Sequence, residues 1–345
     1  MKYILILLFA TLTVTGCSSK KQPVEKADKF AFDTSAVKTT PSAEPNKSVL
    51  LEYKLKKGKE YKYRLTTITR STQTIKADTT MVQDVIQTLT YITDLKPVDV
   101  DKEGVMEISI TFTNIKLVAE ANGNHFLYES GVTKDSSEIL KYADYESMIN
   151  NPFTIRVNKD GELLEIFRTD RMLTNLLDIQ GYSDSLNSAQ KKELKNNLIE
   201  GVLKPLIFQI FRKLPTHKVA KDSTWEFKQS ASRFMVFIMQ NTNIYRFKFL
   251  ANFGNDEVVQ IVDGMKTEIS GGNTFTEKGV TYKFDKPKTE ANGMMFFNIT
   301  EGYVQKAKRH TRLSIFFTMD ANTPTLKQKG SKKAVIDNTY ILELL

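Results

Sequence analysis

Apolar and polar side chains alternate along much of the chain after residue 48. Leu51, Tyr53 and Leu55 alternate with charged residues, and the alternation resumes at Tyr61 beyond a lysine-rich turn. A period of two is typical of a strand with one buried face, so these two runs predict a hairpin. Similar runs predict further strands at 81–95, 105–118, 153–158 and 162–167.

The middle of the chain follows a helical period instead. Thr169 or Asp170 can cap a helix that runs through Ile179 and ends at Gly181. The apolar side chains between these caps gather on one side of the predicted helix.

A second, longer helix is predicted from Asn187 towards Lys213. Apolar residues in its C-terminal half follow i, i+3, i+4 spacing. Pro205 should kink this helix, because its ring meets the carbonyl group of Gly201. An apolar stripe this complete is most often part of a core.

The last third of the chain returns to a period of two. It predicts strands at 224–239, 243–253, 257–269, 279–284, 292–299, 302–319 and 332–345. We therefore expect an α+β fold in which a large curved, mostly antiparallel β-sheet, or several sheets, packs on a central helical segment. Residues 48–345 would form a single body, strand-rich over 48–167, helical over 168–214 and strand-rich over 222–345.

The N-terminus has the pattern of an export signal. A short charged start precedes the apolar run Tyr3–Leu12, which is too short to span a bilayer as a helix. The run leads to Val14-Thr15-Gly16-Cys17, which resembles the lipobox of bacterial lipoproteins. Residues 1–16 are thus expected to be a signal peptide and Cys17 the acylated first residue; a plain signal peptide with an incidental cysteine, or a buried strand, are the alternatives.

Acylation of Cys17 would anchor the protein to a membrane and leave it without a free thiol. Several acyl chains, such as palmitate, would anchor the protein stably to a membrane. Cys17 is the sole cysteine, so thiol catalysis and cysteine metal sites are not expected. Ser18 rather than Asp resembles the outer-membrane sorting signal, and Lys20-Lys21 lacks an acidic export cluster, which favours a periplasm-facing body.

The segment after the lipobox is expected to be a flexible tether over 17–47. It is rich in Lys, Ser, Thr, Pro and Ala and carries only Phe30 and Phe32 as large apolar residues. Such a composition buries too little apolar surface to order itself. The two phenylalanines could dock on a partner, although a chance pair is the simpler interpretation.

Composition sets outer limits on the class of protein. The 345 residues are 41% hydrophobic and carry a formal net charge of +9. This is enough apolar material for a core, and it excludes a collagenous, disulfide-stapled or multi-span membrane protein.

Three stretches of the body carry a family resemblance. They are 51–63 around Lys57-Gly58, 151–162 with Asn151-Pro152-Phe153-Thr154 and the Asp160-Gly161 turn, and Leu214-Pro215 followed by 219–225. Together they resemble a family of uncharacterised bacterial envelope lipoproteins grouped as a domain of unknown function. The third match lacks the glycine of the family's Gly-Asp-Ser-Trp turn. The resemblance implies a lipoprotein without a catalytic signature or known ligand, so no functional residue is carried over.

Tests for chemistry favour a protein that is not an enzyme. No Gly-x-Ser-x-Gly occurs, and the Ser-x-x-Lys at 35–38 falls in the expected tether. His125, His217 and His310 are scattered, and no phosphate-cradling or dinucleotide motif is present. The loop 99–104 starts like a calcium loop but has Ile110 at the twelfth position, so it is interpreted as a hairpin turn. No catalytic residue, metal or cofactor is expected, although carboxylates that converge in space remain an open alternative.

One strand concentrates positive charge. Lys306, Lys308, His310 and Arg312 would share one face and could contact anionic lipid headgroups or a negatively charged glycan. The simpler alternative is a solvated outer strand face. Nucleic acid is not an expected partner, because the protein is expected to be exported.

Runs of consecutive apolar residues suggest a function. In 234–239, 294–297 and 316–317 both strand faces are apolar, so both need cover. One face would pack on the helices, and the other could line a cavity of a few hundred cubic ångströms or a partner site, although a two-layer core explains the same runs. The first hypothesis is therefore non-enzymatic binding of a hydrophobic ligand or lipid. The alternative is an interaction or structural subunit of an envelope protein complex.

Overall fold

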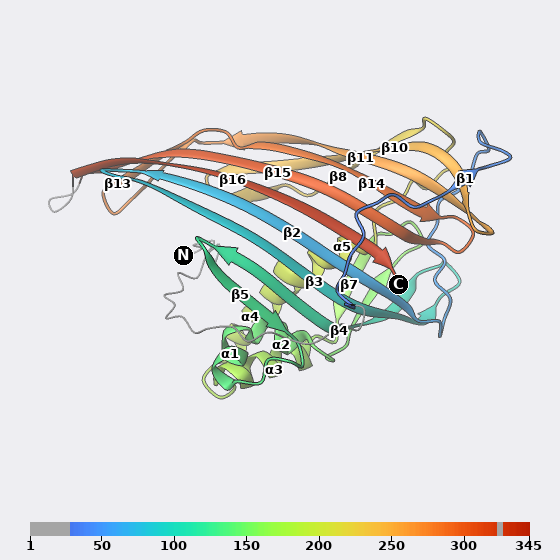
Figure 1. Ribbon diagram of the computed structural model, residues 1–345, viewed down its shortest axis with the longest axis horizontal. Coiled ribbons are helices and arrows are strands. Elements are labelled where there is room, and N and C mark those ends of the chain that lie inside the picture. The colour runs from blue at the N-terminus through green and yellow to red at the C-terminus, as the bar shows by residue number, and fades with distance from the viewer. Residues whose placement is uncertain (1–27, 323–326) are drawn as a thin grey trace.

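The computed structural model describes residues 28–322 and 327–345, and long strands dominate it (Figure 1). The long strands are β2 (Tyr61–Lys76), β3 (Thr80–Val100), β4 (Met106–Ala121), β10 (Phe237–Phe253), β11 (Asp256–Gly271), β14 (Lys288–Asn298), β15 (Tyr303–Asn322) and β16 (Lys327–Leu344). The short strands are β1 (Thr40–Pro41), β5 (Asn124–Glu129), β6 (Phe153–Val157), β7 (Leu163–Phe167), β8 (Thr224–Lys228), β9 (Ser232–Phe234), β12 (Thr274–Glu277) and β13 (Val280–Phe284).

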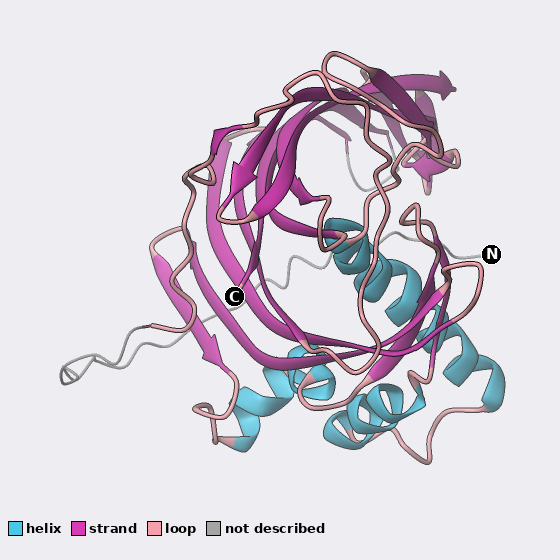
Figure 2. Ribbon diagram, turned by 90° about the vertical axis from the view of Figure 1, so that its right-hand side faces the viewer, coloured by secondary structure: helices cyan, strands magenta, loops and turns pink. Residues whose placement is uncertain are grey.

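These strands form one 16-stranded sheet. Its main order is β1-β10-β11-β14-β15-β16-β2-β3-β4-β6-β7, and neighbouring strands run antiparallel. The last strand, β16, lies between β15 and β2 and so joins the two strand-rich halves. The sheet is open, with β1 and β7 at its two ends, and it curves strongly (Figure 2). The expected curved, mostly antiparallel sheet is confirmed.

Three of the helices lie between the two strand-rich halves in sequence, and two short ones interrupt the first half. They are α1 (Ser136–Lys141), α2 (Ala143–Met148), α3 (Asp170–Gln180), α4 (Ser188–Leu198) and α5 (Lys204–Ile210). The helix predicted after Thr169 is confirmed as α3, and Gly181 ends it with a left-handed φ of 72°. The longer predicted helix is continuous over 188–210, and Asn187 and Gln190 cap it reciprocally.

The distortion expected at Pro205 takes the form of a π-helical turn, η1 (Ile199–Leu203), between α4 and α5. Pro205 has no N–H to donate to the carbonyl of Gly201, and its ring crowds that carbonyl. The wider turn lets the N–H of Lys204 bond the carbonyl of Ile199 instead. Beyond it, α5 packs against the concave side of the sheet, with Ile207 fully buried (Figure 2).

Two helices escaped sequence-based prediction. Asp135 caps α1 by accepting hydrogen bonds from the backbone N–H groups of Ser137 and Glu138, and α2 follows after Tyr142. Asp135 followed three residues later by Glu138 is a start signal that could have revealed α1. Both helices are short and carry little apolar periodicity, so the sequence pattern does not distinguish them from the surrounding strands.

The first expected hairpin is wrong. Leu51, Tyr53 and Leu55 are buried, as their alternation predicts, but 50–60 form no strand. The backbone N–H of Tyr53 donates to the carbonyl of Lys159, and that of Lys54 donates to Gly302. The segment is extended and half-buried like a strand, yet its hydrogen bonds go to loops rather than to a ladder.

Part of the expected tether, within residues 28–47, contacts the sheet. Phe30 is buried, and β1 pairs with Ala251 and Asn252 of β10. The N-terminal part of this segment crosses the convex face of the sheet. A single phenylalanine and a few ion pairs hold it there, which composition alone does not show.

Candidate functional site

The candidate site is the part of the concave face that continues past the helices, on β15, β16, β2 and β3 (Figure 1). We call it the trough and define it by its inward-facing residues on these strands, from Thr311 to Met319, Lys332 to Asn338, Thr69 to Ile75 and Met81 to Gln87. They share the sheet face of Leu65 and Ala307, which pack in the core with the helices.

Side-chain exposure distinguishes the two faces of these strands. On β3 the odd-numbered residues from Gln83 to Leu89 are half-buried, whereas the even-numbered residues from Val82 to Ile86 are exposed. On β15 the odd-numbered residues from Leu313 to Ala321 are buried or half-buried, and the even-numbered residues from Phe316 to Asn322 are exposed. Side chains on a concave face converge and shield one another, whereas those on the convex face diverge into water.

Charged side chains are nearly absent from the inward face of these strands. The trough carries apolar residues such as Leu313, Ile315 and Ile336 together with uncharged polar ones such as Ser71 and Gln73. Among its defined residues, Lys332 is the one charged side chain and no carboxylate is present. A surface of apolar and mostly uncharged polar side chains, without carboxylates, is suited to a hydrophobic ligand.

The far end of the trough is aromatic. Phe317 of β15 packs against Phe284 of β13 with ring centroids 5.1 Å apart, and Phe284 lies 6.5 Å from Phe237 of β10. Phe237, Met239 and Phe284 form a second buried cluster, separate from the main core.

The apolar runs found in the sequence therefore lie in different parts of the structure. In the run 294–297, Met295 and Phe297 belong to the main core, and Phe296 is buried on the opposite face of the strand. The runs at 234–239 and 316–317 contribute Phe237 and Phe317 to the aromatic end of the trough.

A charged cluster lies where the trough meets the helix-filled core. Asp263 of β11 places Oδ1 3.2 Å from a terminal nitrogen of Arg309 and Oδ2 3.1 Å from one of Arg212. Arg309 also donates to Asn243 Oδ1 at 2.9 Å. The Asp263 side chain is 1% exposed, that of Arg212 7% and that of Arg309 15%. Gly293 faces the Asp263 carboxylate, and a Cβ there would collide with it.

Sequence reasoning missed this cluster. Its members lie far apart in the chain, and a single sequence does not show that they meet. The available signal was a charged residue at an inward position of an otherwise apolar strand face, as Asp263 is between Ile261 and Met265.

The basic face predicted on β15 exists, on the convex side. Lys306 pairs with Asp33 at 2.8 Å and Glu343 at 3.6 Å. Both His310 and Arg312 lie near Asp337 Oδ1, at 3.3 and 3.6 Å. Lys308 has no ion-pair partner within 28–322 or 327–345. Three of the four residues thus face carboxylates, and anion binding by this face stays a prediction.

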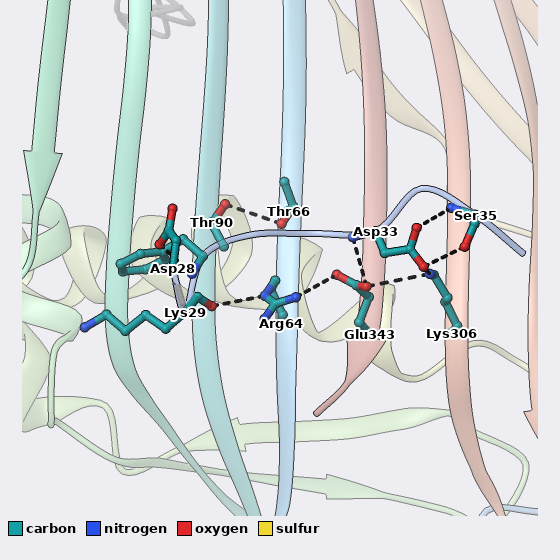
Figure 3. Close-up of polar contacts among 10 residues, drawn as sticks. Asp28, Lys29, Asp33, Ser35, Arg64, Thr66, Thr90, Lys306 and Glu343 are labelled. Atoms are coloured by element: carbon teal, nitrogen blue, oxygen red, sulfur yellow. Dashed lines mark hydrogen bonds and ion pairs between the residues drawn. The ribbon is translucent and has the colours of Figure 1, made fainter. Parts of the chain in front are cut away.

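The chain segment Asp28–Ser35, which we call the N-terminal strap, accounts for part of that pairing (Figure 3). It crosses β3, β2, β16 and β15 on their convex side. The backbone N–H of Asp33 donates to Glu343 Oε1 at 3.1 Å, and Arg64 joins Glu343 Oε2 to the carbonyl of Lys29. The hydrogen bond from Lys306 holds the pKa of Asp33 well below its usual range, with further help from Ser35.

The remaining sequence-based expectations have simple outcomes. Cys17 and the expected signal peptide, residues 1–16, lie outside the described residues. Within 99–104 the strand β3 ends at Val100, and a turn follows in which Asp101 accepts the backbone N–H groups of Glu103 and Val105. No group of three metal-ligating side chains occurs in the described part of the chain. Within that same part, no helix has both the length and the apolar character to cross a membrane.

A pocket of about 340 Å³ lies away from the trough, between the loops near Leu50 and Pro215. Its lining includes Glu52, Glu103 and Asp160. Carboxylates on several sides make it a poor match for the expected hydrophobic cavity. The trough, which is open rather than enclosed, has the more suitable lining.

Comparison with known proteins gives one family match. A family of unknown function, DUF6263, matches residues 103–304. The comparison with curated proteins finds no match.

The solved structures give distant likenesses. A lipovitellin structure titled for its lipid–protein interactions is 12% identical, with a TM-score of 0.42, over 84% of this chain and 25% of that chain. OpdQ of Pseudomonas aeruginosa is 6% identical, with a TM-score of 0.21, over 81% of this chain and 99% of that chain. This chain therefore spans about a quarter of the length of the lipovitellin chain.

Proposed function

The chain belongs to the DUF6263 family of unknown function, and we propose that it binds a hydrophobic ligand, such as the acyl chain of a lipid, in the trough. We further propose that it does so without catalysis, as a lipoprotein acylated at Cys17 and facing the periplasm from the outer membrane. The location rests on the lipobox-like segment and on Ser18. The binding function rests on the trough.

The observation that supports binding is the composition of a half-buried surface. Inward-facing Leu313, Ile315 and Phe317 follow one another on β15. Ile336 of β16 lies beside Leu313, and Val85 of β3 lies further along the same row, beyond Ser71 of β2. Burial of apolar ligand atoms against such side chains gains about 0.8 kcal/mol for each CH₂ removed from water. The uncharged polar residues among them add no charge that an acyl chain would have to desolvate.

Native mass spectrometry of the purified full-length chain tests this proposal. We expect the protein to carry solvent-extractable mass beyond its covalent acyl groups, or to take up oleyl alcohol when it is supplied. Finding neither would contradict ligand binding and would favour the alternative of an interaction subunit, which in-cell crosslinking would then examine.

Two adjacent residues of β3 provide a matched pair of variants. Val85 faces the trough, whereas Ile86 faces outward and is 47% exposed. Val85→Glu introduces a carboxylate where the ligand would lie, so ligand occupancy should fall about fivefold or more. Ile86→Glu should leave occupancy unchanged. Circular dichroism of both variants shows whether the sheet remains folded, and equal occupancy in the two folded variants would place the ligand elsewhere.

A further inference from the structure

The charged cluster forms part of a row of residues that crosses the sheet. Tyr340, Arg309, Gly293, Asp263 and Tyr245 are successive cross-strand neighbours on β16, β15, β14, β11 and β10. The next row towards the helices, which includes Ala307, Ile261 and Phe247, is completely buried. The next row in the other direction begins the trough with Thr311 and Asn338. The cluster therefore closes the inner end of the trough.

This cluster carries more positive than negative charge. Arg212 and Arg309 share the single carboxylate of Asp263, and neither has another ion-pair partner in the described residues. Buried charges are normally matched, because an unmatched one is costly to remove from water. One positive charge is thus left over at a site that is nearly shielded from solvent.

Hydrogen-bond donors are also in surplus there. Arg212 Nε and Trp225 Nε1 are two buried donors without an acceptor among the described residues. Against them stands one buried acceptor, Asp263 Oδ1, which forms an ion pair with Arg309 but no hydrogen bond. The Trp225 ring stacks on Tyr245, with centroids 5.6 Å apart, so this indole belongs to the same neighbourhood. Buried donors usually have partners, and a surplus of donors beside a surplus of positive charge suits an anion.

We propose that the ligand of the trough is an amphiphile with an anionic head group, a carboxylate or a phosphate, which binds at Arg309 and Arg212. This inference rests on the proposed function and specifies its ligand class. The head group would accept hydrogen bonds from the two guanidinium groups. The polar residues Thr311, Asn338 and Thr69 come next along the trough, and the chain would then run over Leu313 and Ile315.

The length of the trough is appropriate for such a chain. From Arg309 to Phe317 the strand β15 advances eight residues, which is about 27 Å at 3.4 Å per residue. The polarity of the inward residues falls along this path, from Arg309 through Thr311 to Leu313 and then to Phe317. An anionic amphiphile has the same order of polarity from head to tail.

The test measures the affinity of the full-length chain for three probes below their micelle-forming concentrations: oleate, oleyl alcohol and 1-oleoyl lysophosphatidate. We expect the anionic probes to bind about tenfold more tightly than the alcohol. Whichever of oleate and lysophosphatidate binds more tightly identifies the head group. Equal affinity for all three would overturn the anionic-head inference and leave the proposed function intact. If none binds, the proposed function itself fails.

Variants at the cluster give a second readout. Arg309→Gln should bring the ratio of oleate to oleyl alcohol affinity close to one. Lys266→Gln is the control, because Lys266 lies on the same strand as Asp263 but faces outward with its side chain 69% exposed, and it should leave the ratio unchanged. If both affinities fall together in Arg309→Gln, Arg309 is only structural and the inference is wrong.

Asp263→Asn changes the ratio in the opposite direction. It removes the carboxylate that competes with the ligand for the two arginines, so the preference for oleate should rise. The ratio is measured on the folded fraction and does not depend on how much protein folds. A ratio that stays constant across Arg309→Gln and Asp263→Asn would contradict the proposal.

Discussion

Tyr53 and Arg212 are joined by hydrogen bonds that fasten the extended N-terminal segment of the body to the end of α5. The backbone N–H of Arg212 donates to the Tyr53 hydroxyl at 2.8 Å, and that hydroxyl can donate to the carbonyl of Arg212 at 3.3 Å. Burial raises the pKa of Tyr53, so the hydroxyl stays neutral. The contact fixes the backbone of Arg212, whose side chain reaches Asp263.

Tyr53→Phe should therefore destabilise the protein. It leaves the buried N–H of Arg212 without an acceptor, which costs about 1–3 kcal/mol of unfolding free energy. Urea denaturation measures the change. Tyr182→Phe is the control, because Tyr182 is 53% exposed, and it should have little effect. Equal stability of the two variants would show that the hydrogen bond adds nothing.

Gly161 is required at the same junction. Its φ is +83°, and a Cβ there would lie 2.4 Å from the carbonyl oxygen of Arg212 and 2.6 Å from the Tyr53 ring. Gly123 has a similar φ of +81° but open space around it. Gly123→Ala should cost about 1 kcal/mol through backbone strain alone, and Gly161→Ala should cost clearly more because the backbone of Arg212 must also move. Thermal unfolding of the two variants compares them, and similar melting temperatures would argue against the steric role.

The cap of the long helix provides a local test. The Asn187 side chain accepts the backbone N–H of Gln190, and the Gln190 side chain accepts that of Asn187. Asn187→Ala should lower the free energy of unfolding by about 1 kcal/mol. Asn196→Ala, at an exposed position within α4, should be neutral or slightly stabilising, because alanine has the higher helix propensity. Denaturant midpoints that rank the two variants the other way would contradict the capping role.

Those parts of the fold that depend on local signals could be predicted from the sequence. The cap at Asn187 and the glycine stop at Gly181 lie within a few residues of the elements they bound, so both helices were located correctly. Strand alternation likewise identified most of the long strands. It failed at Leu51–Leu55, where an extended segment buries alternate residues without pairing, because alternation reports burial rather than hydrogen bonding.

Contacts between distant parts of the chain were beyond sequence analysis. Asp263 and Arg309 meet because β11 and β15 both flank β14, and Arg212 joins them from the segment that follows α5; neither relationship is encoded locally. The predicted basic face of β15 consists of even-numbered residues, whereas Arg309 lies on the opposite face of the same strand. A single charge at an inward position, among the apolar side chains of that face, is the more informative signal.

The N-terminal strap shows how ion pairing can dock a polar segment, and its pH dependence can be predicted. Lys306 lowers the pKa of Asp33 in the docked state relative to the free segment. A carboxyl group with a lowered pKa stabilises the docked state above the ordinary aspartate pKa, and this contribution is lost as the pH falls through the lowered value. Strap docking should therefore weaken progressively below about pH 4. Hydrogen exchange of the Asp33 amide, which donates to Glu343, reports docking.

In Lys306→Met the Asp33 pKa, measured by NMR, should return towards the ordinary value. A Lys57→Met control, which removes the partner of Asp99 on the surface, should leave it unchanged. If the Asp33 pKa is ordinary in the unaltered protein, the strap is not held by this ion pair.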